Sequence, residues 1–402
     1  MDIIILADFL GRFDNSLNNR FLYLANILEK NHKVEIITSD FNHGTKEYFE
    51  GIPKGFSYKI TMLHEPRYLK NVCIKRFFSH FIWGKNVKKY LENRKKPDVI
   101  YCAMPTLTAA YEAGKYCEKN GIRFIVDVQD LWPEAFEMVF HVPLLSNIIF
   151  APFRAIANAA YKRADSICAV SEMYLNRALS VNKKCKGGHC VFLGTNLENF
   201  DSNVEQFSEE EIHTQLPNQK VDDVWLAYCG TLGSSYDLTC VFDALEVVKS
   251  KEIDPPTFIV MGDGPRKHEF EQYASKKGLD VIFTGSLPYT QMCGLLCMCD
   301  ITVNPIMHGA AQSIINKHAD YVASGLPVLN TQECKEYRYL VDSYKMGYNC
   351  KNNDAEDLAE KMIIIINDSN LREKMGRNAR KCAEEKFDRK HTYQELINVV
   401  LE

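Results

Sequence analysis

Long apolar runs are missing from this sequence of 402 residues, and none approaches the roughly 18 residues that a membrane-spanning helix needs. The N-terminus enters a strand-like stretch of isoleucines without the basic segment of a secretory signal. These absences predict a cytoplasmic protein. Hydrophobic residues make up 46% and charged residues 25% of the chain, which excludes a disordered or collagen-like class and predicts about two or three globular domains.

Metal-binding patterns are missing as well. The 14 cysteines are scattered, and none stands with histidines at the spacing of a zinc site. The densest group, Cys293, Cys297 and Cys299, lies in an apolar stretch. We interpret these thiols as small buried side chains of a reduced compartment, with a thiolate cluster as the alternative. The sequence therefore predicts neither a metal nor a cofactor.

Charge is unevenly spread along the chain. Residues 1–200 hold 27 Lys and Arg against 20 Asp and Glu, whereas the remainder holds 21 against 32. The basic residues concentrate in residues 66–96, where they alternate with aromatic residues such as Phe78 and Trp83. Such a segment is typical of peripheral binding to an anionic membrane, and a solvated basic face is the alternative. The acidic second half argues against nucleic acid as the partner.

Hydrophobic periodicity predicts two similar α/β halves. Residues 2–7 and 34–38 read as buried strands, and residues 18–30 between them have apolar side chains at helical spacing, which makes a βαβ unit. A second alternation begins at residue 225, after a polar, acidic connection over residues 201–223. We therefore predict a domain over 1–205, a second over 206–385, and a terminal helix over 386–402 that packs back on the first.

Glycines follow two predicted strands of the second half. Gly230 and Gly233 come after one strand, and Gly262 and Gly264 come after the next. Glycines at strand ends let the backbone turn tightly and approach a ligand closely. Ordinary tight turns are the alternative interpretation for both pairs.

A helix that begins near Asn316 has the features of an anion site. Free N–H groups at a helix start favour a diphosphate, and Lys317 adds a full charge in the first turn, where the helix dipole disfavours a cation. Asp320 lies three residues on, where it is placed to accept hydrogen bonds from ribose hydroxyls. An intrahelical ion pair between Lys317 and Asp320 is the alternative.

Together these segments resemble glycosyltransferase family 4. The resemblance rests on the two glycine pairs, on residues 316–328, and on the Asp-Leu-Trp-Pro-Glu element at residues 130–134. It implies the α/β GT-B fold, with two Rossmann-like, doubly wound domains facing a cleft and C-terminal helices. It also implies a retaining transfer, without metal, from a UDP- or GDP-sugar to a polyprenyl-diphosphate-linked glycan. Such enzymes act at the inner membrane face in the synthesis of capsule, O-antigen and exopolysaccharide.

The resemblance also implies the roles of individual residues. Asp130, Gln129 and Lys317 are expected to be catalytic. The residues expected to bind the donor are Gly230, Gly233, Gly262, Gly264, Arg266, Leu287, Gln312, Ser313, Asn316, Lys317 and Asp320.

This sequence departs from the family pattern at several of these positions. Gln312 and Asp320 replace two glutamates that the family commonly carries eight residues apart. Thr231 and two serines stand where many members have basic residues that hold the diphosphate. The glycine pair after the first strand is replaced by a polar loop over residues 11–20. Its polar side chains are able to face the cleft: Asn15, Ser16, Asn18, Asn19 and Arg20.

Other interpretations stay open at this stage. A sugar-nucleotide 2-epimerase shares the fold, and a catalytically silent subunit that binds a nucleotide sugar for a partner would tolerate Gln312. Asp130 has a structural alternative, because an aspartate at this place also suits the cap of a helix starting at Trp132 and Pro133.

Overall fold

The computed structural model describes residues 1–11, 13, 19–70, 73–137, 143–185, 187–207, 223–309 and 313–402. It contains two compact units. The first comprises Met1–Phe192 together with Thr392–Glu402, and the second comprises Leu193–His391.

The first unit is built on a parallel sheet of seven strands in the order β5-β2-β1-β6-β7-β8-β9. The central strands consist almost entirely of buried apolar residues, as expected for a sheet covered on both faces. The strands are β1 (Asp2–Leu6), β2 (Lys33–Ser39), β5 (Lys59–Leu63), β6 (Val99–Met104), β7 (Arg123–Val128), β8 (Ser166–Ala169) and β9 (His189–Cys190). A separate antiparallel pair consists of β3 (Phe41–Asn42) and β4 (Glu47–Tyr48).

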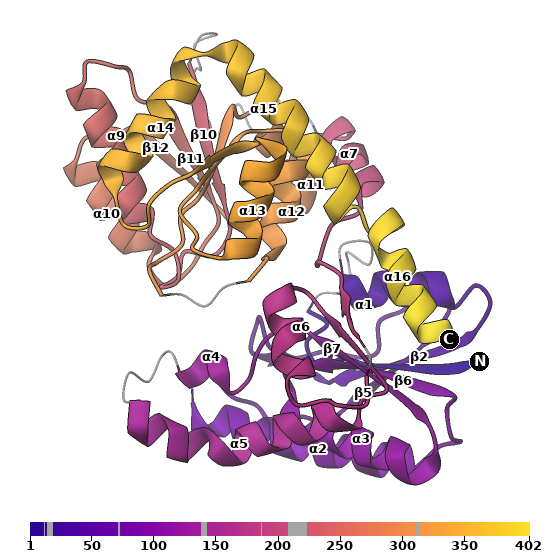
Figure 1. Cartoon of the computed structure of the whole chain (residues 1–402). Coiled ribbons are helices and arrows are strands. Elements are labelled where there is room, and N and C mark those ends of the chain that lie inside the picture. The colour runs from indigo at the N-terminus through magenta and orange to yellow at the C-terminus, as the bar shows by residue number, and fades with distance from the viewer. Residues whose placement is uncertain are drawn as a thin grey trace. The chain divides into compact units, whose positions relative to one another are not determined.

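Helices cover both faces of this sheet (Figure 1). On one face, α1 (Arg20–Leu28) and the terminal α16 (Arg389–Leu401) share a core in which Tyr23 and Tyr393 make an edge-to-face contact. The other face carries α2 (Ile74–Asn93), α3 (Leu107–Asn120) and α5 (Pro143–Arg163), which pack on one another. Two short helices, α4 (Glu134–Glu137) and α6 (Glu172–Leu179), follow β7 and β8.

The second unit has a parallel sheet of six strands in the order β12-β11-β10-β13-β14-β15. The strands are β10 (Trp225–Cys229), β11 (Thr257–Met261), β12 (Val281–Gly285), β13 (Ile301–Asn304), β14 (Val328–Asn330) and β15 (Gly347–Asn349). Side chains alternate between the two faces, so that Leu226 and Tyr228 enter one core whereas Trp225 and Ala227 enter the other.

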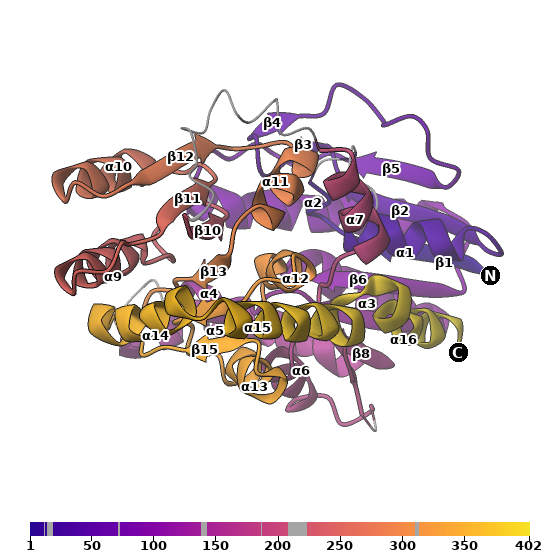
Figure 2. The ribbon, with the colours of Figure 1, turned by 90° about the horizontal axis from the view of Figure 1, so that it is seen from above.

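Each core of the second unit is closed by its own helices. The helices α9 (Leu238–Ser250) and α10 (Lys267–Lys276) lie side by side over one face with α14 (Ala355–Asn367), as Figures 1 and 2 both show. The opposite face is covered by α11 (Tyr289–Cys297) and α12 (Asn316–Ala323). The remaining helical elements are α13 (Lys335–Tyr344), α15 (Ser369–Cys382) and the π-helix η1 (Ala383–Phe387).

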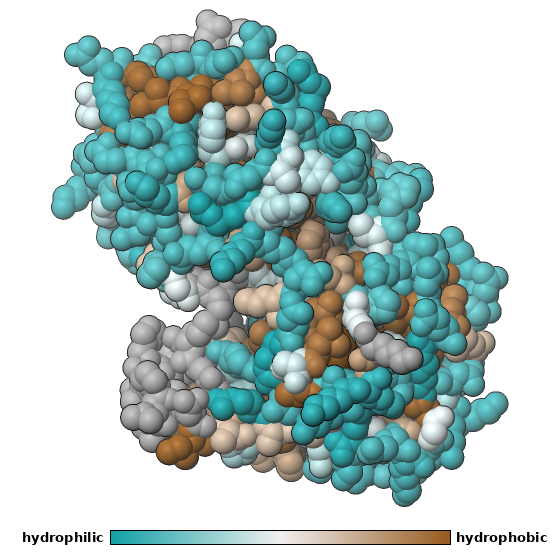
Figure 3. Space-filling view, in the orientation of Figure 1, coloured by the Kyte–Doolittle hydropathy of each residue, from teal (hydrophilic) through white to brown (hydrophobic). Residues whose placement is uncertain are grey.

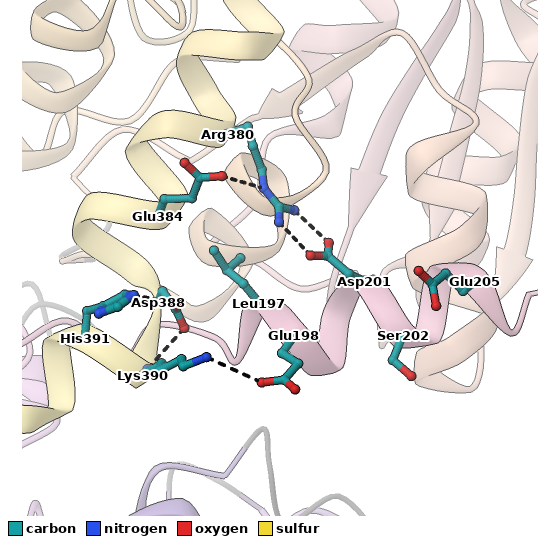
Figure 4. Close-up of a pocket in the computed structure, with 10 residues that line it drawn as sticks. All are labelled: Leu197, Glu198, Asp201, Ser202, Glu205, Arg380, Glu384, Asp388, Lys390 and His391. Atoms are coloured by element: carbon teal, nitrogen blue, oxygen red, sulfur yellow. Dashed lines mark hydrogen bonds and ion pairs between the residues drawn. The ribbon is translucent and has the colours of Figure 1, made fainter.

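The helix α7 (Leu197–Glu205) belongs to the second unit, so the units divide after Phe192 and not after the expected residue 205. The contacts of α7 with the second unit explain this boundary. The α7 helix packs on α11, and Arg380 of α15 donates to both carboxylate oxygens of Asp201, at 2.7 and 2.6 Å. Figure 4 shows this pair in a hollow of about 460 Å³, where Lys390 faces Glu198 and the imidazole of His391 faces Asp388.

The predicted α/β class with two parallel sheets is confirmed. Among the described residues, no helix combines the length and the apolar character that crossing a bilayer requires.

Candidate functional site

The glycine turns of the second unit pack backbone against backbone at the carboxyl ends of β10 and β11. A Cβ on Gly262 would lie 1.9 Å from the carbonyl oxygen of Gly230, and a Cβ on Gly264 would lie 2.4 Å from that of Leu232. Side chains therefore do not fit at either position. Gly230 itself has φ +141°, and a Cβ there would lie 2.7 Å from Nζ of Lys317. The glycines thus bring the first turn of α12 close to these two strand ends.

Lys317 is surrounded by aromatic rings. Its Nζ donates to the hydroxyl of Tyr228 at 3.1 Å and lies 4.2 Å from the centre of that ring and 3.7 Å from the centre of the Tyr236 ring. Burial lowers the pKa of Lys317 to about 7. Among the residues that the structure describes, no carboxylate pairs with this ammonium, so the expected alternative of an ion pair with Asp320 is wrong.

Asp320 points instead at the hydroxyl of Tyr289, which donates to its Oδ1 at 2.9 Å. The Tyr289 oxygen also lies 3.4 Å from Oγ1 of Thr195. Burial raises the pKa of Asp320 to about 6, against the opposing effect of the tyrosine hydrogen bond. One carboxylate oxygen of Asp320 is therefore engaged by the protein, and a role toward a ribose stays a prediction.

The segment before α12 is held by buried amides. Gln332 donates through Nε2 to the carbonyl of Ser313 at 3.0 Å, and Asn304 bonds Oδ1 of Asn330 at 2.9 Å and Nε2 of His318 at 3.1 Å. The hydroxyl of Ser313 is buried without a hydrogen-bond partner among the described residues. These contacts fix the start of the helix, where its free N–H groups lie. Asn316 begins α12 and is exposed, and its contact with a donor stays a prediction.

The other predicted donor residues are spread more widely. The side chain of Arg266 pairs with Glu269 of its own helix and covers the Phe270 ring at 4.6 Å. Leu287 is partly buried against the core that α11 and α12 cover, and a Cβ on Gly233 would meet only the Thr231 side chain, at 3.8 Å. Gln312 lies outside the described residues. The structure thus brings together Gly230, Gly262, Gly264 and Lys317. The guanidinium of Arg266 is instead paired with Glu269.

In the first unit, a buried ion pair organises the expected catalytic segment. Arg20 donates to both oxygens of Asp127, at 2.9 and 3.1 Å, and its side chain is 4% exposed. The expectation that Arg20 is available to a ligand is therefore wrong, because its remaining donors bond Tyr393 and the carbonyls of Val191 and Phe192. Nε2 of Gln129 also donates to Asp127, at 2.7 Å.

Asp130 holds an indole in place. Its carboxylate accepts from the backbone N–H of Leu131 at 2.9 Å and from Nε1 of Trp132 at 3.1 Å, with the Tyr174 hydroxyl at 3.5 Å. Burial raises the pKa of Asp130. Because α4 begins only at Glu134, these contacts fix Trp132 and do not make the expected helix cap.

The sequence reasoning missed the tyrosines around the second-unit site. Tyr228 lies in a strand and Tyr289 begins α11, so both read as core positions. Tyr236 and Gln332 were missed as well. They follow strands β10 and β14 by a few residues, and this position after a strand is the sequence signal that could have identified them.

Comparison with known proteins agrees with this geometry. Residues 209–382, which make up most of the second unit, match the family model of Glycosyl transferases group 1. The whole chain resembles solved GT-B glycosyltransferases, which makes the GT-B fold a finding. Together these findings indicate a glycosyltransferase.

Three known proteins illustrate this similarity. The chain is 22% identical over 319 residues to the putative colanic acid biosynthesis glycosyl transferase WcaI of Escherichia coli K12, covering 76% of this chain and 74% of WcaI. HepE of Anabaena, solved in complex with UDP, superposes with a TM-score of 0.70 at 14% identity and complete coverage of both chains. WaaG, a glycosyltransferase of lipopolysaccharide biosynthesis, gives a TM-score of 0.69 at 15% identity over 99% of each chain.

Proposed function

We propose that this protein is a retaining glycosyltransferase that moves a hexosyl or N-acetylhexosaminyl group from a UDP- or GDP-sugar to a lipid-linked glycan of a bacterial surface polysaccharide. The observation that supports this most is Lys317. It is a partly buried cation at the start of α12, next to free backbone N–H groups, and within the described chain it has no carboxylate partner. A diphosphate supplies the missing anion.

The proposed reaction needs positioning and charge stabilisation. The bond between the anomeric carbon and the diphosphate oxygen breaks while the bond to the acceptor oxygen forms on the same face of the sugar. The leaving diphosphate takes the acceptor proton. Lys317 and the start of α12 stabilise the developing diphosphate charge without a metal. Asp130 and Gln129 are proposed to contact the acceptor or the sugar from the first unit.

An exposed apolar face supports the lipid-linked acceptor. On α2, Ile74, Phe78 and Phe81 are 87, 59 and 46% exposed, and Ile148 of α5 is 73% exposed. Figure 3 shows apolar atoms along the lower edge of the first unit, where α2 and α5 lie. Interfacial segments insert such side chains at the boundary between headgroups and acyl chains.

The charges of this proposed membrane face differ from those expected. Lys85 and Lys88 lie 2.6 and 3.9 Å from the carboxylate of Glu112, and Trp83 is buried. Arg67, Lys70 and Lys75, in the sequence around the start of α2, are exposed cations. We therefore propose that the start of α2, and not its middle, meets an anionic leaflet.

Thermal unfolding with a panel of nucleotides and nucleotide sugars tests the proposed donor. A ligand at 100 times its Kd stabilises the native state by about 2.7 kcal/mol, so a true donor raises the unfolding temperature measurably. Lys317→Ala should remove most of that shift. Lys335→Ala is the matched control, because Lys335 also lies in the first turn of a helix and is exposed. The proposal fails if no nucleotide stabilises the wild type, or if both variants respond as the wild type does.

A further inference from the structure

A second cluster of polar side chains lies in the first unit, apart from the donor-site residues. Asp8 follows β1, Glu65 follows β5 and His80 lies in α2, and they are 6, 1 and 4% exposed. One ligand atom of each lies within 4.8 Å of the other two. These residues are separated by up to 72 positions in the chain, so the fold alone brings them together.

Hydroxyl groups orient the two carboxylates of this cluster. Thr106 donates to Oδ2 of Asp8 at 2.8 Å, while Ser39 and Ser79 donate to Oε2 and Oε1 of Glu65, each at 2.7 Å. Hydrogen bonds of this kind are what metal-binding carboxylates receive from their surroundings.

Nε2 of His80 has no hydrogen-bond partner among the described residues, and Oδ1 of Asp8 has none apart from the neighbouring carboxyl group of Glu65. The nearest carboxylate atom to that imidazole nitrogen is Oε1 of Glu65, at 3.8 Å, which is beyond a hydrogen bond. Buried polar atoms normally have partners, and a bound ion is one physical explanation for such exceptions. Both atoms belong to side chains that are more than nine-tenths buried.

The charges around this cluster also favour a bound cation. The buried guanidinium of Arg76 interacts with the carboxyl groups of Asp8, Glu65 and Asp130, and so one cation faces three acidic groups. Lys46 also lies near Glu65, but it is partly exposed and donates to the carbonyl of His43. A cation bound among these carboxylates would be attracted by the excess of acidic groups.

We propose that Asp8, Glu65 and His80 bind a divalent cation of the Zn²⁺ or Mn²⁺ class. One imidazole nitrogen and two carboxylate oxygens favour these ions over Ca²⁺ and Mg²⁺, which prefer oxygen ligands alone. The cation would join the ends of β1 and β5 to α2. Because the His80 ring stacks on Trp132 at 5.1 Å with an interplanar angle of 2°, it would also fix the indole that Asp130 binds. The proposal does not rest on the donor site.

Titration with Mn²⁺ tests this site in the full-length protein. Mn²⁺ is the better first probe because the 14 free cysteines compete for Zn²⁺ and not for an ion that prefers oxygen ligands. After treatment with a chelator and dialysis, loss of the free Mn²⁺ signal in electron paramagnetic resonance should show one tight ion per chain. Zn²⁺ should displace that ion, and either metal should raise the unfolding temperature.

Variants separate this site from surface binding. Asp8→Asn and His80→Gln should each weaken Mn²⁺ binding at least tenfold. Thr106→Val keeps all three ligands and removes only the hydroxyl that orients Asp8, so it should fold and still bind about 10–100-fold more weakly. His64→Gln is the matched control, because His64 faces Asp40 at 2.9 Å on the surface. The proposal is overturned if the wild type takes up no tight ion, or if Thr106→Val and His64→Gln bind as tightly as the wild type.

Discussion

The pKa of Lys317 predicts that nucleoside diphosphate binding takes up a proton above pH 7. Burial among tyrosines holds this pKa near 7, so the free protein carries an ammonium there below pH 7 and a neutral amine above it. An anion bound beside Nζ stabilises the ammonium and raises the pKa. The apparent affinity should therefore fall as the pH rises above 7.

The magnitude follows from the fraction of protein that is charged. With a pKa of about 7, about half of the molecules carry the ammonium at pH 7 and about a tenth at pH 8. The affinity for UDP or GDP should then fall about fivefold between pH 7 and 8, and close to tenfold per unit above that. About 0.9 proton should be taken up per nucleotide bound at pH 8.

Isothermal titration calorimetry between pH 7 and 8.5, in two buffers of different ionisation enthalpy, measures both quantities. This window avoids Asp320, whose pKa is about 6, and His318, whose pKa burial lowers well below its usual value. Burial raises the pKa of Tyr228 beyond the window. Lys317→Met keeps the length of the side chain and should abolish the proton uptake, whereas Lys335→Ala should retain it. Nucleotide binding without proton uptake in the wild type at pH 8 would refute the reasoning.

Four further predictions concern other parts of the molecule. Asp130→Asn should lower kcat with little change in nucleotide affinity, and lost stability with unchanged kcat would leave Asp130 a purely structural residue. Phe78→Glu should reduce co-sedimentation with anionic vesicles at low salt, whereas Ile52→Glu, at a side chain that is 60% exposed outside α2 and α5, should not; equal sedimentation would contradict the membrane face. Nucleotide affinity should be the same with and without EDTA, and a loss that Mg²⁺ restores would place a metal at the diphosphate. Arg20→Met should lower the free energy of unfolding by about 3–5 kcal/mol in urea titrations, because it leaves Asp127 buried and unpaired; a change below about 1 kcal/mol would contradict that account.

The sequence predicted the strands and the glycine turns well because both depend on neighbouring residues. Runs of buried apolar side chains mark β1 and β10, and the positions of Gly262 and Gly264 at a strand end reflect backbone contacts that no other residue permits. The helix that starts at Asn316 was predictable for the same reason, since its polar start and its end at Gly325 are local signals.

Side-chain partners far apart in the chain were not predictable. Arg20 looked available for a ligand because Asp127 lies 107 positions away. Lys85 lies in the basic segment that was predicted to bind a membrane, and no local pattern indicates that Glu112 of α3 pairs with it. Such pairings depend on which elements the sheet order places next to each other, and a single sequence does not encode that order in any local pattern.

The return of residues Thr392–Glu402 to the first unit affects how the chain folds during synthesis. The second unit is continuous from Leu193 to His391, so all of its residues are available before residues 392–402 are made. The first unit is translated first, yet Tyr393, Leu396 and Val400 of its core arrive last. An apolar face over β1 and α1 therefore stays open to water, or to a chaperone, while about two hundred further residues are translated.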